Sequence, residues 1–219
     1  MPELDHIFCL SPFGAEVEAR ALQRVGLLEG SRNNHPGQGT ACRRFFFENV
    51  YIELLWVSDA NETQCELTRR TRLWERWSKR KSGASPFGVV LRAGDTPGAD
   101  CPFASWAYHP SYLPPNLSID IAEGTPLQEP EFLYLGFQRD RAREGTEPTS
   151  HRLPVTKVTS VVVSAPTSGD RSTAARALET MGLLRFAIAD EHLISLTFDS
   201  GAAHKTADLR PDVPMLLHW

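Results

Sequence analysis

The stretch His35–Val57, HPGQGTACRRFFFENVYIELLWV, holds a glycine-bearing loop followed by two extended segments that a tight turn joins. Asn49 fits the turn, because asparagine tolerates the left-handed backbone conformation and can hydrogen-bond its own backbone. After the turn, residues 51–57 alternate with the two-residue period of a strand, and both faces are apolar except at Glu53. The pattern predicts a strand buried on both sides. The carboxylate of Glu53 must then be paired, bound to a metal or protonated.

The composition is that of a soluble globular protein, since 41% of the 219 residues are hydrophobic and 23% are charged. A formal net charge of −4 gives no electrostatic case for binding nucleic acid or an anionic membrane. No apolar run approaches the ~20 residues of a spanning helix, and the N-terminus does not resemble a signal peptide. Four scattered cysteines without CxxC spacing are expected to be reduced. We therefore expect a cytoplasmic protein with no nucleic-acid or membrane partner.

Upstream of the quoted stretch, the sequence predicts a strand over residues 4–10 and a helix over about 15–25. The helix has an apolar stripe at the helical period, acidic residues in its first turn and Gly26 at its C-terminal cap. A weak strand is expected over residues 27–32. With the two strands of the quoted stretch, the order is strand, helix and three strands.

The region over residues 58–154 is more polar and begins with a basic helix predicted over 66–81. That helix is interpreted as a cover with a solvated basic face, and an anion-binding flap is the alternative. A proline-rich aromatic loop over 102–115 has material for a pocket wall, and the charged residues 138–154 are typical of a linker. Short strands are also expected here, over residues 87–92, 117–122 and 132–137.

The C-terminal part repeats the opening pattern. Glu18–Leu28 reads EARALQRVGLL and Ala174–Leu184 reads AARALETMGLL, so seven of eleven positions are identical. Self-similarity of this kind bears on architecture. We predict an α+β fold with two βαβββ modules, residues 1–57 and 155–219, and a strand-rich insertion over 58–154, packed as one compact domain. The second module is expected to hold strands over 156–165, 185–190, 193–199 and 215–219 and a helix over 171–181.

Four segments carry a family resemblance: LDHIF near the start, the helix ending in GLL, HPGQGTACRRFFF and YIELLWV. They resemble the vicinal oxygen chelate superfamily, with its glyoxalase/bleomycin-resistance fold, and more narrowly the glyoxalase-like domain proteins. The resemblance is looser over residues 85–137 and depends on module order beyond residue 155. It implies paired βαβββ modules that curl into a half-open barrel. It also implies a divalent metal inside the barrel and a homodimer, since dimers are frequent in the superfamily.

His6 and Glu53 fall on the ligand positions of that motif in the first module. The resemblance implies that the first and last strands of the module are neighbours, which brings the imidazole and the carboxylate together. Such a pair suits Zn, Fe, Ni or Mn. Aligning the second module on its strand ends places Ser160 opposite His6 and Met215 opposite Glu53, and neither is a good ligand. Further ligands would come from a second chain or from elsewhere in this one, with His109, Glu123 and His151 as candidates.

Three interpretations of His6 and Glu53 stay open. They are metal ligands, or a metal-free acid/base pair in which burial raises the pKa of Glu53, or structural residues. In the structural case, Glu53 is salt-bridged to Arg43 or Arg44. The loop over residues 35–40 either binds an anion or a carbonyl group through its backbone N–H groups or is a plain connection whose glycines permit the turn.

The resemblance implies a small-molecule enzyme of the lyase, isomerase or dioxygenase type that acts on an oxygen-bearing substrate, with Glu53 and His6 as catalytic residues. The alternative is a non-catalytic protein that sequesters a small molecule, as bleomycin-resistance proteins do. Phosphate-loop, dinucleotide-binding, HExxH and GxSxG motifs are absent from the sequence, so no cofactor besides a metal is expected. The substrate pocket is expected to be lined by Phe8, Arg44, Phe46, Tyr51, Trp106, Tyr108 and His109.

Overall fold

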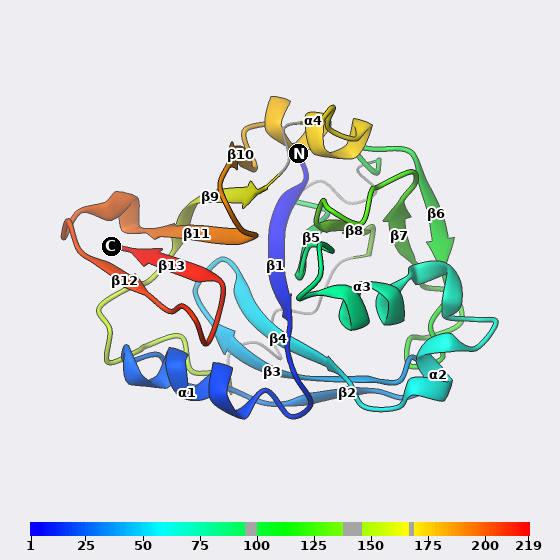
Figure 1. Cartoon of the computed structure of the whole chain (residues 1–219), viewed down its shortest axis with the longest axis horizontal. Coiled ribbons are helices and arrows are strands. Elements are labelled where there is room, and N and C mark those ends of the chain that lie inside the picture. The colour runs from blue at the N-terminus through cyan, green and yellow to red at the C-terminus, as the bar shows by residue number, and fades with distance from the viewer. Residues whose placement is uncertain (95–99, 138–145, 167–168) are drawn as a thin grey trace.

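Two β-sheets form the framework of the computed structural model, which describes residues 1–94, 100–137, 146–166 and 169–219 (Figure 1). The larger sheet has, in spatial order, the strands β2 (Asn33–His35), β3 (Thr40–Phe46), β4 (Tyr51–Val57), β1 (Glu3–Leu10), β5 (Phe87–Arg92), β8 (Glu131–Leu135), β7 (Ile119–Ala122) and β6 (Ser105–Tyr108). The smaller sheet has the strands β10 (Arg185–Ile188), β9 (Val158–Ala165), β11 (Leu193–Phe198), β13 (Met215–His218) and β12 (Thr206–Asp208). The helices are α1 (Glu16–Arg24), α2 (Ala60–Gln64), α3 (Leu73–Lys79) and α4 (Thr173–Thr180), with single 3₁₀ turns at Arg69–Thr71 and Asp199–Gly201.

Strand β1 is the centre of the larger sheet. It pairs in parallel with β4 and antiparallel with β5, and β5 in turn pairs in parallel with β8. The halves β2-β3-β4-β1 and β5-β8-β7-β6 therefore have the same internal order and meet at the β1–β5 pair. This curled sheet is the half-open barrel predicted from the sequence, and the predicted α+β class is confirmed.

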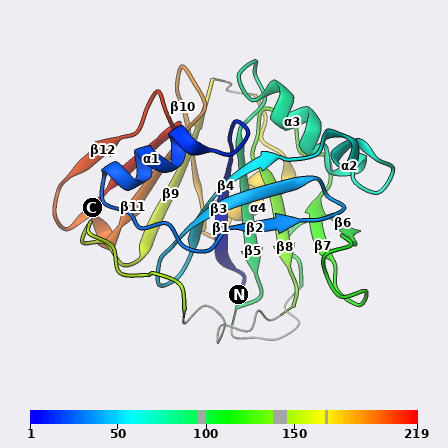
Figure 2. The ribbon, with the colours of Figure 1, turned by 90° about the horizontal axis from the view of Figure 1, so that it is seen from below.

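The pairing differs from the expectation in one respect. The second half of the barrel comes from residues 87–135, which the sequence places in an insertion. Residues 155–219 instead pair among themselves as the smaller sheet, beside the barrel (Figure 2). The division of the chain at residues 57 and 154 stays a prediction, and residues 138–145 of the predicted linker lie outside the described residues.

The internal repeat marks the C-terminal end of a helix in both places and does not indicate which strands pair. Gly26 and Gly182 have left-handed φ values of 100° and 72° after α1 and α4. In each case the next N–H turns back to the helix, from Leu27 to the Leu22 carbonyl at 3.1 Å and from Leu183 to that of Leu178 at 3.0 Å. This backbone reversal requires glycine, which explains why the repeat is visible although the two modules pair their strands differently.

Several local predictions are corrected by the structure. The weak strand expected over residues 27–32 lies at Asn33–His35, and the loop over 102–115 contains β6. The long helix expected over 66–81 is interrupted, because Arg72 has a left-handed φ of 59°. The short edge strand β12 was not predicted. No helix among the described residues is both long and apolar enough to cross a membrane.

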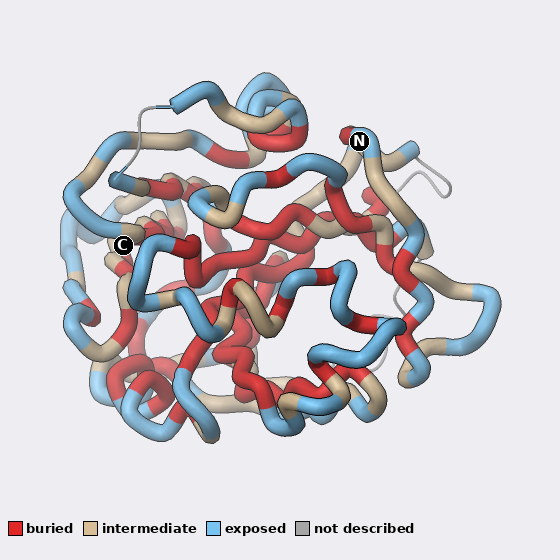
Figure 3. Tube along the Cα trace, turned by 45° about the vertical axis from the view of Figure 1, so that its right-hand side comes forward, coloured by how far each residue is buried: buried red, intermediate tan, exposed pale blue. Residues whose placement is uncertain are grey.

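Alternation along the strands of the larger sheet separates two apolar regions. On β1, Ile7 and Cys9 belong to the core between the two sheets, whereas Phe8 and Leu10 belong to a second cluster on the inner face of the barrel. Strand β4 is buried throughout its length and β1 from Asp5 onwards, within the buried centre of the molecule (Figure 3). A two-residue period therefore directs one set of side chains to packing and the other set to the inside of the barrel.

The helices α1 and α4 help to hold the sheets together. Arg24 at the end of α1 forms an ion pair with Asp212, which precedes β13 of the smaller sheet, at 2.5 Å. The backbone N–H of Ser172, the N-cap of α4, donates to Glu129 just before β8 of the larger sheet at 2.8 Å. The end of α1, in the first module, thus bonds to the segment before a strand of the smaller sheet. The start of α4, in the second module, bonds to the segment before a strand of the larger sheet.

Gly88 tests the packing at the β1–β5 pair. It lies opposite Phe8, and a Cβ atom at this position would be 1.9 Å from Phe8 Cζ. We expect Gly88→Ala to lower the free energy of unfolding by roughly 1–3 kcal/mol through overpacking, measured by urea denaturation. Gly136→Ala is the control, because its Cβ would meet only an ordinary contact at 3.5 Å. If the loss comes from steric overlap with Phe8, the Phe8→Leu/Gly88→Ala double variant should be more stable than the two single effects added together. A double variant that is no more stable than this sum would contradict the steric explanation.

Candidate functional site

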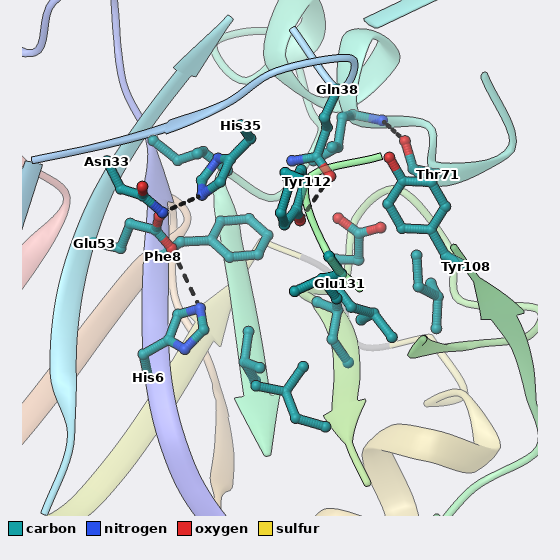
Figure 4. A pocket seen from close by; sticks show the side chains of 18 of the residues that line it. His6, Phe8, Asn33, His35, Gln38, Glu53, Thr71, Tyr108, Tyr112 and Glu131 are labelled. Carbon is teal, nitrogen blue, oxygen red and sulfur yellow. Dashed lines mark hydrogen bonds and ion pairs between the residues drawn. The ribbon is translucent and has the colours of Figure 1, made fainter. Parts of the chain in front are cut away.

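A cavity of about 320 Å³ lies on the inner face of the larger sheet. Strands β1, β4, β5 and β8 form its floor, and residues at the start of α3 and around Tyr112 contribute to its walls (Figure 4). The lining is mixed, with apolar side chains along the middle and titratable groups at the ends. Such a concave space with a few polar groups is typical of a small-molecule site.

A chain of three buried polar groups, Asp5, His6 and Glu53, lies at one end of this cavity. His6 Nδ1 is 2.6 Å from Asp5 Oδ2, and His6 Nε2 is 3.2 Å from Glu53 Oε2 (Figure 4). The imidazole ring stacks on Tyr51, with ring centroids 4.3 Å apart. Parallel pairing of β1 with β4 produces this arrangement, since it places His6 beside Tyr51 and the next inward residue of β1 beside Glu53.

The charges of this group depend on each other. Burial by itself would lower the pKa of His6, but the hydrogen bonds to Asp5 and Glu53 outweigh it and raise that pKa. Burial likewise would raise the pKa of Glu53, yet the hydrogen bond and charge of His6 lower it to about 2. The expectation of a raised pKa for Glu53 is therefore wrong, because it took account of burial and not of the opposing hydrogen bond and charge of the imidazole. The geometry favours an imidazolium between two carboxylates.

His35 and Cys42 lie beside the same carboxylate. One ligand-type atom of each, together with one of Glu53, falls within 4.8 Å of the others. The ring of His35 is fixed by Thr40 Oγ1 at 3.0 Å and by the Asn33 amide at 3.1 Å. The Cys42 thiol is buried, and burial together with the charge of Glu53 raises its pKa.

Sequence reasoning did not single out these two residues, although a signal was present. Cys42 and Arg44 are two residues apart on β3, so their side chains lie on the same face of the strand, the inner face of the barrel. His35 begins the quoted stretch, but its strand β2 is only three residues long, too short for a periodic pattern. Adjacency to Glu53 depends on the β2–β3–β4 pairing.

Comparison with known proteins places this fold and this cavity in a family. The model of the glyoxalase-like domain matches residues 4–181. The chain belongs to the glyoxalase-like domain family. No curated protein sequence matches the chain.

Two solved structures to which this chain is similar are described as hypothetical proteins. A hypothetical protein from Staphylococcus aureus is 9% identical with a TM-score of 0.55, and the match covers 100% of this chain and 99% of that one. A hypothetical protein from Bacillus halodurans C-125 is 12% identical with a TM-score of 0.40, over 64% of this chain and 96% of that one. The first likeness shows a shared fold and nothing about chemistry.

The second half of the glyoxalase-like barrel does not repeat the His6–Glu53 arrangement. Glu53 pairs with Phe8, Phe8 with Gly88, and Gly88 with Glu131, so Glu131 stands in the second half where Glu53 stands in the first. Pro86, two places before Gly88, stands where the first half has His6, two places before Phe8. The second half therefore keeps the carboxyl group and has no imidazole at the position of His6. The earlier choice of Ser160 and Met215 is corrected, because both lie in the smaller sheet.

The other residues considered as ligands are placed elsewhere. His151 contacts the backbone N–H of Leu28 at 3.0 Å and the Phe46 carbonyl at 2.8 Å. Glu123 forms an ion pair with Arg70 at 3.4 Å. His109 is exposed. Among the described residues, the candidate metal ligands are therefore those around Glu53.

These residues fit a divalent metal in their chemistry. Carboxylate, imidazole and thiolate are donors that Zn, Fe, Ni and Mn accept in differing degree. Asp5 on the outer nitrogen of His6 resembles the carboxylate that orients metal-bound histidines in other proteins. The raised pKa of Cys42 means that a metal would have to displace its proton.

The predicted lining residues are divided by the structure. Phe8, Arg44, Tyr51 and Tyr108 line the cavity. Phe46 packs against Tyr51 with ring centroids 5.1 Å apart and is itself buried. The remaining two are Trp106, which lies beneath the Arg70 guanidinium next to a second cavity, and His109, which is exposed.

A second carboxyl group, that of Glu131, lies at the far end of the cavity and was not predicted. It is 3% exposed, and burial raises its pKa to about 7 against the opposing charges of Arg76 and Arg72. The alternation Glu131, Leu133, Leu135 along β8 would have placed it on the inner face, had the strand been assigned to the barrel.

Glu131 makes the stability of the protein depend on pH. Because its pKa is about 7 in the folded chain against 4.5 for the free group, the folded state binds more protons between these values, and stability falls as the pH rises through them. We expect wild type to lose about 3 kcal/mol relative to Glu131→Gln from below pH 4.5 to above pH 7. Urea denaturation at both ends of this range measures the difference. The exposed Glu123→Gln is the control, and a pH-independent difference for Glu131→Gln would contradict the assignment.

Proposed function

We propose that this protein is a glyoxalase-like enzyme that acts on a small oxygen-bearing molecule in the cavity, with His6 and Glu53 at the reacting end. The observation that carries the proposal is the buried chain from Asp5 through His6 to Glu53, which ends at the cavity. A group of buried charges in a concave site, in which His6 and Glu53 have perturbed pKa values, is typical of acid/base chemistry.

His6 has the geometry of a proton donor and acceptor. Asp5 holds Nδ1 and leaves Nε2 directed towards Glu53 and the cavity. In the proposed reaction, Nε2 transfers a proton to or from an oxygen of the bound substrate, and the anionic carboxylate of Glu53 stabilises the imidazolium form. General acid–base catalysis by a positioned histidine contributes roughly 10²–10⁴-fold to a rate.

A divalent metal would be held by Glu53 with His6, Cys42 or His35, and it would polarise substrate oxygens as a Lewis acid. The protein residues would then orient the ligands and exclude water. The proposal includes reactions of the lyase, isomerase and dioxygenase types.

The protein is further proposed to act in a reducing compartment such as the cytoplasm. All four cysteines are free thiols, and two of them are buried on different faces of the larger sheet. Structural disulfides are rare in the cytoplasm. The homodimer implied by the family resemblance stays a prediction, which analytical ultracentrifugation of the purified chain measures.

The metal is tested on protein purified without added metal or chelator. We expect about one equivalent of a divalent metal per chain in wild type and none in a His6→Ala/Glu53→Ala double variant, measured by mass spectrometry of the elements. Cobalt substitution should produce a thiolate-to-metal absorption band that Cys42→Ser abolishes and the exposed Cys65→Ser retains. Wild type without metal and without tight binding on titration would sink the metal-dependent version and leave the metal-free acid/base pair.

Glu53→Gln separates an enzyme from a sequestering protein. In an enzyme, we expect the rate to fall roughly 10²–10⁴-fold while a bound ligand is retained, measured on a panel of small molecules with two adjacent oxygens. Glu123→Gln, on the surface outside this cavity, should leave the rate unchanged. A sequestering protein would instead show no turnover on the panel, near-indifference to Glu53→Gln and weaker binding after Phe8→Ala.

A further inference from the structure

Two buried polar groups without partners lie at the end of the cavity remote from His6. Glu131 is 3% exposed and Tyr108 is 2% exposed, and both line the cavity. Neither Glu131 Oε2 nor the Tyr108 hydroxyl has a hydrogen-bond partner among the described residues. Leaving buried polar atoms unpaired costs free energy, so this pair of groups calls for a ligand.

The two ends of the cavity lie along one row of the sheet. Glu53 pairs with Phe8, Phe8 with Gly88, and Gly88 with Glu131. Three strand spacings on a flat sheet amount to about 14 Å, and the curl of the barrel shortens the direct path. The Phe8 ring lies over Gly88 between the ends. The cavity therefore has an apolar middle between two carboxyl groups.

The two carboxyl groups differ in how their charge is compensated. Glu53 is matched by His6 at 3.2 Å. The two cations whose charge acts on Glu131, Arg76 and Arg72, have other partners. Arg72 is paired with Glu75 at 2.9 Å. The buried guanidinium of Arg76 donates to three carbonyl groups of the loop before β8, those of Pro126 at 3.3 Å, Leu127 at 3.4 Å and Glu129 at 2.7 Å.

We propose that Glu131 and Tyr108 form an anchoring site for the protonated amino group of a small molecule. An ammonium group has three donors and no acceptor, which matches a carboxylate oxygen and a phenolic oxygen that both lack donors. The aromatic ring of Tyr108 lines the same end (Figure 4), and such rings attract cations. A cation would add a compensating charge beside Glu131 that a neutral hydroxyl group would not.

The site gives the substrate of the proposed enzyme two separated features, an amino group at the Glu131 end and reacting oxygens at the Glu53 end. This assignment of ends depends on the proposed function, whereas binding of the amine at Glu131 does not. Burial holds the pKa of Glu131 at about 7, so a bound cation would also ionise this carboxyl group and lower its pKa.

Matched aromatic probes test the anchoring site. Benzylamine is a cation at neutral pH, and benzyl alcohol has nearly the same size without a charge. Binding of both to the full chain is measured by calorimetry and by NMR. We expect wild type to prefer benzylamine, Glu131→Gln to weaken benzylamine roughly ten- to hundredfold, and Tyr108→Phe to weaken it less. Glu123→Gln should change neither affinity, and Glu131→Gln should leave benzyl alcohol unchanged.

Three outcomes would overturn the proposal: no benzylamine binding up to its solubility limit, equal affinity for benzyl alcohol, or benzylamine affinity that Glu131→Gln leaves intact. Loss of benzylamine binding in Glu53→Gln instead would place the amine at the other end and overturn the anchoring site while leaving the enzyme proposal standing. Conversely, benzylamine held by Glu131 without turnover of any oxygen-bearing molecule would support the site and contradict the enzyme. If Glu131→Gln fails to fold, carboxyl NMR measures the pKa of Glu131 in wild type with and without benzylamine. A drop in that pKa on adding benzylamine would support the site, and an unchanged pKa would overturn it.

Discussion

The pairing of β1 with β4 on one side and β5 on the other is the constraint on which the rest of the molecule depends. It joins the two halves of the barrel, and it sets which side chains of β1 meet the core and which meet the cavity. Because β1 and β4 run in parallel, His6 and Glu53 meet inside the barrel at 3.2 Å. A shift of one residue in this register would place the two groups on opposite faces of the sheet.

The barrel is symmetric in its strand order and asymmetric in its chemistry. The first half places His6, Cys42 and Glu53 on the inner face, whereas the second half has a carboxyl group, Glu131, but has Pro86 in the place of His6. Glu131 lies in the same row of the sheet as Glu53 and has a different pKa. Two carboxyl groups in one cavity are thus separated into an ionised and a readily protonated group by their neighbours, an imidazole in one case and burial without a partner in the other.

Sequence reasoning succeeded where local patterns are strong. The strand at residues 4–10, the helix ending at Gly26 and the strand at 51–57 all follow from alternation and capping, and the contact of His6 with Glu53 follows from the family resemblance. It was wrong about which segment completes the barrel. The repeat that suggested residues 155–219 reflects a glycine-capped helix, a local feature that is compatible with more than one strand pairing.

By itself, the sequence determined the α+β class, the strands with a clear two-residue period and the presence of a carboxylate on a strand buried on both faces. Only the tertiary structure decided which strands are neighbours. It thereby decided that an imidazole lowers the pKa of Glu53, that Cys42 and His35 lie beside it, and that Glu131 shares its cavity. The physical reason is that alternation fixes the face on which a side chain lies, whereas its neighbours on that face come from strand pairs formed between residues far apart in the chain.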